Sequence, residues 1–398
     1  MEKTIKIVVK TFFGLEEVLQ EELKELGYES TEKLNRAVQL TGTWKDVYRI
    51  NLFARCALSV LVELRSFQIS EENDLYKEAL KVDWPSLFGV DKTFAIKGAV
   101  NSHLFKHSQF PFLLVKDAVA DVFRKETGER PDVNIRTPQV VIDLYVRENQ
   151  GTLSVNTSGL PLFHRGYRQS TGEAPLNEVV AAGLIRLSGW DRKSTFVDPF
   201  CGSGTLLIEA ALLATGIPST IERTHYAFKN LKNYDRVLWE DMHAAANKIV
   251  KELPCIITGS DIDADMVTIA RRNLRNFSFG RFIPIQVEDV ANVKFPEEKG
   301  TLITNPPYGE RLATDVVELY EQIGSTFKHQ LQGYTCWVIS SSEEGFKSVG
   351  LRPERKIKLF NGDLECSFRK FTIYDGSKKA KNQHADSVET ETSKEEEE

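Results

Sequence analysis

Cysteine is scarce and scattered in this sequence. The 398 residues contain five cysteines, and no two of them form a CxxC pair. A disulfide framework or a structural zinc site is therefore not expected, and a reducing cytoplasm is the simplest compartment. The chain also lacks any apolar run of the roughly 18–20 residues that cross a bilayer, and its N-terminus has no signal-peptide pattern. We therefore expect no contact with a membrane.

A strong excess of either charge is also missing. The formal net charge is −6, with 41% hydrophobic and 27% charged residues, which is ordinary for a globular protein with two or three domains. The charge is uneven, because residues 92–170 carry 11 Lys or Arg against 7 acids. This segment can face phosphates, although a solvated surface explains it equally well.

The first 160 residues alternate short strands and helices and hold no catalytic constellation. TIKIVVKTFFG reads as a strand and LEEVLQEELKELG as an amphipathic helix. QVVIDLYVRENQGTLSVNTSG predicts a strand hairpin that turns at residues 149–151. His103 and His107 lie four apart, but no carboxylate or thiol stands at ligand spacing, so no metal site is expected.

From about residue 190 the pattern changes to apolar strands that alternate with helices. STFVDPF, CIITGSDID, FIPIQVEDV, TLITNPPY and YTCWVISS are too apolar to be half-exposed. They predict an α/β fold whose parallel sheet is covered by helices on both faces. ERKIKLF and LECSFRKFTIY predict a terminal hairpin and hence an antiparallel edge. The last residues, 377–398, are polar and read as a disordered acidic tail.

Polar residues follow four successive predicted strands. Ligands of such sheets bind where the strands end. Any one of these acids can simply cap the next helix, but four in succession are hard to explain as caps. The strand ends carry Asp198, Phe200, Gly202, Gly204 and Thr205, then Asp261 and Ile262, then Asp289, then Asn305 to Tyr308.

The residue types at these strand ends predict a nucleoside ligand with a positive charge. Gly202 and Gly204 allow close backbone approach, but the phosphate-loop lysine and the third glycine of a dinucleotide site are missing. Asp198 would repel a phosphate and attract an amino group or a sulfonium. Asp261 can accept from both ribose hydroxyls, Ile262 can cover the adenine, and Asp289 can accept from its amine. The cofactor predicted is S-adenosyl-L-methionine.

The stretch NPPY predicts the catalytic residues. Pro306 and Pro307 have fixed φ angles and must end the strand. Taken alone, two adjacent prolines are explained by a stiff loop. Taken with the other motifs, they favour a rigid site in which the Asn305 side-chain oxygen and the Pro306 carbonyl bind an exocyclic amine, with Tyr308 stacked on the base. The base must first leave its stack to reach this site.

These motifs resemble those of a known family. DPFCGSGT with NPPYGER is similar to class I amino-methyltransferases, and LFHRGYRQSTGEAPLNEVVAAGLI is similar to bacterial THUMP-domain 23S rRNA guanine-N2 methyltransferases. The resemblance covers residues 1–375. It implies a Rossmann-like class I methyltransferase domain at 161–376. It also implies a ferredoxin-like region at 1–65 and an overlapping THUMP module at 45–158 that binds structured RNA.

Two regions stay open at this point. Arg165 and Arg168 can bind RNA phosphate or fix a domain junction, and Arg311 is a further RNA-contact candidate. The stretch between Asp198 and Asp261 is longer than one crossover needs. We expect its aromatic residues to belong to a helix packed on the face of the methyltransferase sheet; RNA contact is the alternative. They are Tyr226, Phe228 and Trp239.

Three functions compete with large-subunit rRNA guanine-N2 methylation. A tRNA guanine-N2 enzyme and a nucleic-acid adenine-N6 enzyme share the NPPY chemistry. A DNA adenine-N6 methyltransferase is disfavoured, because no dedicated target-recognition domain is expected after the catalytic domain. A non-catalytic RNA-binding assembly factor would show a broken cofactor loop or a lost Asn305, and neither is seen. A cysteine nucleophile is not expected either, because Cys201 lies in the cofactor loop.

Overall fold

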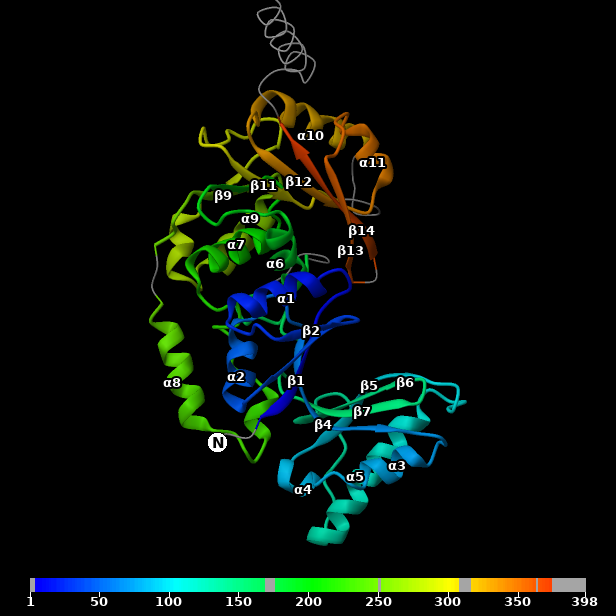
Figure 1. Cartoon of the computed structure of the whole chain (residues 1–398). Coiled ribbons are helices and arrows are strands. Elements are labelled where there is room, and N and C mark those ends of the chain that lie inside the picture. Colours follow the sequence, from blue (N-terminus) through cyan, green and yellow to red (C-terminus); the bar gives the residue numbers. More distant parts are fainter. Residues whose placement is uncertain (1–3, 169–175, 250–251, 308–315, 363, 374–398) are drawn as a thin grey trace, which may run out of the picture. The chain divides into compact units, whose positions relative to one another are not determined.

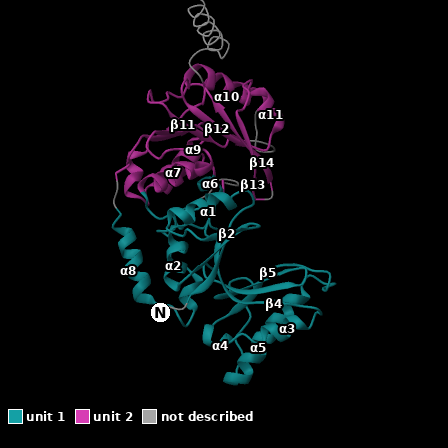
Figure 2. Cartoon of the chain, in the orientation of Figure 1, with its two compact units in different colours: residues 1–169, 178–183, 216–251 teal, residues 170–177, 184–215, 252–398 magenta. Residues whose placement is uncertain are grey.

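The chain folds into two compact units. The computed structural model describes residues 4–168, 176–249, 252–307, 316–362 and 364–373 (Figure 1). Unit 1 comprises residues 1–169, 178–183 and 216–251, and unit 2 comprises the remainder (Figure 2). Each unit contains its own seven-stranded sheet. Among the residues that the structure describes, no helix combines the length and apolar character that a membrane span requires.

The sheet of unit 1 has the strand order β2-β3-β1-β4-β7-β6-β5 and is antiparallel except for the β5–β6 pair. Its strands are β1 (Ile5–Lys10), β2 (Thr31–Leu34), β3 (Ala37–Gly42), β4 (Ser59–Gln68), β5 (Phe94–Asn101), β6 (Val140–Arg147) and β7 (Gln150–Asn156). The helices wholly within this unit are α1 (Glu16–Glu25), α2 (Trp44–Phe53), α3 (Asp74–Ala79), α4 (Trp84–Leu87), α5 (Phe110–Thr127), η1 (Ala227–Asn230) and α8 (Arg236–Asn247). The predicted β6–β7 hairpin is present, but its predicted turn at 149–151 is wrong: Arg147 pairs with Gln150, so the turn consists of Glu148, at φ 51°, and Asn149.

The sheet of unit 2 has the order β10-β9-β8-β11-β12-β14-β13. Its strands are β8 (Thr195–Asp198), β9 (Ile257–Asp261), β10 (Ile285–Val287), β11 (Gly300–Thr304), β12 (Thr335–Ser340), β13 (Arg355–Asn361) and β14 (Leu364–Thr372). Its helices are α7 (Thr205–Thr215), α9 (Ala264–Leu274), η2 (Ser278–Phe282), α10 (Val316–Gln330) and α11 (Glu343–Ser348), while α6 (Glu178–Leu187) is shared between the units. The first five strands in this order pair in parallel, and β14 joins β12 antiparallel. The predicted α/β class and its antiparallel terminal hairpin are confirmed.

The parallel strands form because both of their faces are buried. Every residue of β8 is buried, and so are the last four of β11 and the last five of β12. Leu302 and Val338 from these strands pack with Ile323 and Phe327 of α10 in one apolar cluster. This burial pins the register of β8 beside β11 and therefore the position of the residues that follow each strand.

The expected position of the insertion is wrong. Its aromatic residues belong to unit 1 and pack on α2, not on the face of the methyltransferase sheet. The Tyr48 ring lies 4.8 Å from that of Phe228 and 6.1 Å from that of Trp239, and Tyr226 stacks on Phe228 at 5.1 Å. These three aromatic side chains are almost fully buried, which also removes them as RNA contacts.

Candidate functional site

The site lies where the strand order of unit 2 reverses. The chain passes from β8 to β9 and β10 on one side, then returns to β11 and β12 on the other side of β8. A crevice forms at the carboxyl ends of the strands at such a point, and ligands bind there. Asp198 ends β8, Asp261 ends β9 and Asn305 follows β11.

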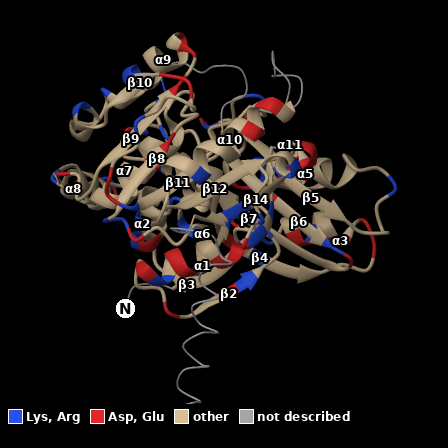
Figure 3. Cartoon of the chain, turned by 90° about the horizontal axis from the view of Figure 1, so that it is seen from above, with Lys and Arg blue, Asp and Glu red and all other residues tan. Residues whose placement is uncertain are grey.

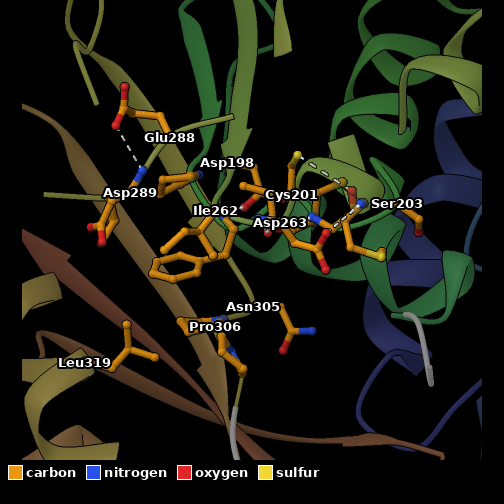
Figure 4. A pocket seen from close by; sticks show the side chains of 18 of the residues that line it. Asp198, Cys201, Ser203, Ile262, Asp263, Glu288, Asp289, Asn305, Pro306 and Leu319 are labelled. Carbon is orange, nitrogen blue, oxygen red and sulfur yellow. Dashed lines mark hydrogen bonds between the residues drawn. The ribbon is translucent and has the colours of Figure 1, made fainter. Parts of the chain in front are cut away.

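A cavity of about 640 Å³ occupies this crevice (Figure 4). Of the predicted cofactor residues, Asp198, Phe200, Gly202, Thr205, Asp261, Ile262 and Asp289 line it, and so do Asn305, Pro306 and Pro307 of the predicted catalytic set. Gly204 is not a lining residue. It precedes α7 with φ 83°, and a Cβ there would stand 3.2 Å from that of Ala270 on α9. Tyr308 and Arg311 lie outside the described residues.

Asp198 is a buried carboxylate that lines the cavity. It is 1% exposed and forms no ion pair with any described residue. Its Oδ1 accepts from the Thr304 hydroxyl at 2.7 Å and from the Phe200 amide at 3.2 Å. Burial raises the pKa of Asp198 to about 7, although these two hydrogen bonds oppose the rise. The site therefore holds a carboxylate that a cationic ligand would stabilise.

Asp261 connects the end of β9 to the glycine loop. One of its carboxylate oxygens accepts from the Gly202 amide at 2.8 Å, and the other accepts from the Asp263 amide at 3.1 Å. Gly202 has φ 51°, a conformation that glycine adopts without strain. The next side chain, Ile262, is 68% exposed although it is apolar, and it faces the cavity (Figure 4). An apolar side chain in this position suits a flat aromatic ligand.

Asp289, the third carboxylate expected at the strand ends, is held by Gln322, a residue that was not predicted from the sequence. The Gln322 side chain, on α10, donates to Asp289 Oδ1 at 2.8 Å, and the Ala291 amide donates to the same oxygen at 2.9 Å. Glu288 accepts from the Asp289 amide at 3.2 Å. Glu288, Glu318 and Gln322 all line the cavity without having been predicted. Glu288 could have been predicted, because it directly precedes Asp289 in the sequence. Glu318 and Gln322 could not, because no sequence pattern shows that α10 lies beside the end of β10.

Asn305 has an unused acceptor. Its Oδ1 is buried and has no hydrogen-bond partner within the described part of the chain. Buried polar atoms are rarely left without a partner, because the loss costs about 1–3 kcal/mol. Pro306 beside it is buried, so the position of the acceptor is fixed by the strand before it and the prolines after it. An N–H donor that enters the cavity would satisfy this atom.

The cavity has an excess of negative charge. Its lining includes Asp198, Asp261, Asp263, Glu288, Asp289 and Glu318, and no Lys, Arg or His among the described lining residues. This arrangement suits a cationic ligand and opposes a phosphate. Cys201 also lines the cavity, but burial raises the pKa of its thiol well above the usual value. A protonated thiol is a poor nucleophile, so Cys201 is disfavoured as a catalytic nucleophile.

Two of the predicted RNA-contact arginines are used inside unit 1. Arg165 is 1% exposed, and its guanidinium donates to the carbonyls of Leu162 at 3.0 Å and Arg55 at 2.5 Å. Arg168 forms an ion pair of 2.9 Å with Glu178. The structure argues against the phosphate role for Arg165, because a buried guanidinium bonded to carbonyls cannot reach an RNA phosphate; both carbonyls belong to unit 1, so the junction role stays a prediction.

Comparison with known families places this site in context. A model described as "RMKL-like, methyltransferase domain" matches residues 165–370, which is more than half of the chain. The chain belongs to this family. A THUMP domain model matches residues 70–156, and a model of the RlmL ferredoxin-like domain matches residues 6–61. The predicted family and its ferredoxin-like, THUMP and methyltransferase modules are confirmed; their predicted boundaries stay predictions.

Curated relatives carry a more specific name. The chain is 37% identical over 373 residues to the ribosomal RNA large subunit methyltransferase K/L of Psychromonas ingrahamii, and 38% identical over 371 residues to that of Shewanella frigidimarina. Each match covers 92% of this chain but only 50% and 52% of the relatives. The chain thus spans about half the length of the curated relatives it matches.

A solved structure supports the fold over nearly the whole chain. SMU.472, solved in complex with SAH (S-adenosylhomocysteine), superposes with a TM-score of 0.83 at 28% identity. The match covers 95% of this chain and all of that one. The family's class I methyltransferase fold is therefore present here, with the acidic cavity at its switch point.

Proposed function

We propose that this chain is an S-adenosyl-L-methionine-dependent RNA methyltransferase that modifies guanine N2 in 23S rRNA. The names of the relatives, the THUMP match and the acidic cavity support this assignment. The observation that carries it is the buried, unpartnered Asn305 oxygen beside Pro306 in a cavity with surplus carboxylates. The scarcity of cysteine, five in 398 residues without a CxxC pair, fits a reaction in the reducing cytoplasm.

The cofactor residues are proposed from their geometry. Asp198 would hold the amino group of the methionine moiety, Asp261 the ribose hydroxyls, and Asp289 the adenine amine, with Ile262 against the adenine ring. The bound cofactor supplies an electrophilic methyl group on a sulfonium. The hydrogen bonds from Thr304 to Asp198 and from Gln322 to Asp289 hold two of these carboxylates in place before the ligand arrives.

The chain's contribution to transfer is to orient the amine. The lone pair of an exocyclic amine is delocalised into its base, which makes the nitrogen a weak nucleophile. Asn305 Oδ1 and the Pro306 carbonyl would each accept one N–H bond and favour a tetrahedral nitrogen whose lone pair faces the methyl group. A strong general base is not required, since the nitrogen loses its proton after the new bond forms.

Deletion and complementation test the proposal. In a deletion strain, nucleoside mass spectrometry of purified 23S rRNA should show less N2-methylguanosine, and the wild-type gene should restore it. Asn305→Ala should fail to restore it and should lower the single-turnover rate by roughly 100- to 1000-fold, as for loss of one preorganised transition-state hydrogen bond. Asn292→Ala is the matched control, because Asn292 is exposed and does not line the cavity.

The outcomes separate the competing substrates. Loss of N2-methylguanosine from tRNA, or of N6-methyladenosine from either RNA, would move the assignment to that substrate. Unchanged methylation in every RNA class would refute the proposal that the chain is an RNA methyltransferase. Full activity of Asn305→Ala would refute the proposed role of the amide, even if the substrate is correct.

A further inference from the structure

An acid-free basic segment lies outside the cofactor cavity. Residues 266–287 contain four arginines and no Asp or Glu, although the whole chain has a net charge of −6. The four are exposed, and none forms an ion pair with another described residue. They are Arg271, Arg272, Arg275 and Arg281. Elsewhere Arg65 and Arg236 are neutralised by glutamates.

Three of these arginines surround one open hollow of about 730 Å³ on unit 2. Arg271, Arg275 and Arg281 line it together with apolar residues, and no carboxylate is among the lining residues. Figure 3 shows blue segments beside the labels α9 and β10, where this surface lies. An open hollow lined by three arginines and no carboxylate suits an anionic ligand.

An exposed aromatic ring, that of Phe282, lies beside one of the arginines that line the hollow. Arg271 Nη2 donates to the Ile285 carbonyl at 2.5 Å, which fixes this side chain against the edge strand β10. The Arg281 guanidinium lies 4.6 Å from the centre of the Phe282 ring, and Phe282 is 55% exposed. Positively charged side chains beside an exposed aromatic ring are the usual combination for binding RNA phosphates with base stacking.

The position of this surface separates it from the cofactor site. The helix α9 begins directly after Asp263 at the cavity and ends at Leu274. At about 1.5 Å per residue, Arg275 lies roughly 18 Å along the helix from Asp263. A phosphate bound here therefore belongs to a nucleotide other than the one being methylated.

We propose that this arginine surface, formed by Arg271, Arg272, Arg275 and Arg281 with Phe282, is a second RNA-binding site that holds the substrate at a distance from the target base. This inference rests on the proposed RNA methyltransferase function. It assigns RNA contact to the methyltransferase unit itself, in addition to the THUMP module. RNA phosphates are the occupant because three of these arginines line one hollow that has no carboxylate among its lining residues, and none of the four forms an ion pair with a described residue.

The test measures RNA affinity against salt. The double variant Arg275→Ala/Arg281→Ala removes two exposed guanidiniums and leaves Arg271, which supports β10, in place. The matched control is Arg352→Ala/Arg355→Ala, whose side chains are also exposed and without ion pairs to described residues. Binding of transcribed 23S rRNA is measured by filter retention at several salt concentrations, and SAH affinity is measured by calorimetry.

The expected result is a several-fold loss of RNA affinity and a slope of log Kd against log salt that is smaller by about 1.4–1.8, as for the loss of two phosphate contacts. SAH affinity and kcat should stay at the wild-type level while KM for RNA rises. If wild-type protein methylates RNA but the double variant behaves like the control, the second site does not exist. If wild-type protein neither binds nor methylates RNA, the proposed function fails as well.

Discussion

Replacing Asp198 by Asn should stabilise the protein at neutral pH while it removes cofactor binding. Asp198 is buried, and its folded-state pKa of about 7 lies above the roughly 3.9 of an unfolded aspartate. A pKa raised by folding contributes stability below the unfolded value, and that stability is lost as pH rises through the folded value. The ligand-free protein therefore loses stability between about pH 4 and pH 7 because this carboxyl must ionise in a buried site.

The size of the effect follows from the pKa difference. About three pKa units at roughly 1.4 kcal/mol each give an upper limit of about 4 kcal/mol at pH 8. Asn has the same shape and no charge, but its amide nitrogen replaces one acceptor. We therefore expect the free energy of unfolding of Asp198→Asn to exceed that of wild type by about 2–4 kcal/mol at pH 8, on the order of 5–10 °C in melting temperature. The difference should vanish below about pH 4.

Thermal denaturation from pH 4 to pH 8, with and without SAH, measures both effects. SAH should raise the melting temperature of wild type and leave that of Asp198→Asn unchanged. Asp265→Asn is the control, because it makes the same chemical change at an exposed position on α9. A variant that melts at or below the wild-type temperature at pH 8, or that still binds SAH normally, would refute the reasoning.

Three further predictions use the same structure. Thr304→Val removes the donor to Asp198, so SAH affinity measured by calorimetry should fall at pH 7.5 and recover as pH rises, whereas Thr304→Ser should keep it. Ile262→Ser should weaken SAH binding about tenfold, from the loss of roughly 1.4 kcal/mol of apolar contact, without a change in melting temperature. Trp239→Ala should destabilise unit 1 by about 3–5 kcal/mol through the cavity left beside Tyr48, as measured by urea unfolding, while SAH affinity is retained.

The parallel sheet and the residues at its strand ends were predictable from local sequence. Strands buried on both faces are rich in apolar residues, so β8, β11 and β12 stand out from their surroundings, whereas β9, ITGSD, is apolar only where Cys255 and Ile256 lead into Ile257. Once they are parallel neighbours, the residues after each strand must share one edge. That is why Asp198, Asp261, Asp289 and Asn305 meet at one cavity although more than 100 positions separate the first from the last.

The parts that could not be predicted depend on contacts between distant segments. The aromatic residues of the insertion predicted a buried helix. Their spacing does not show whether they pack on Tyr48 or on the methyltransferase sheet. An arginine in the sequence does not show whether its partner is a phosphate or a carbonyl, and Arg165 bonds to the carbonyl of Arg55, 110 positions away. Gln322 could not be found either, because its partner Asp289 precedes it by 33 positions and one intervening strand.

Strand β11 connects the proposed cofactor site, through Thr304, with the proposed amine site at Asn305. Thr304 is fully buried and donates to Asp198 on the neighbouring strand, while the next residue, Asn305, carries the unpartnered acceptor. The backbone that holds the acceptor for the amine is therefore the same backbone that holds the carboxylate for the cofactor. A change that shifts β11 relative to β8 must affect cofactor affinity and amine orientation together, whereas Asn305→Ala changes only the second. In this proposal the fixed φ angles of Pro306 and Pro307 would hold Asn305 in its place next to Thr304.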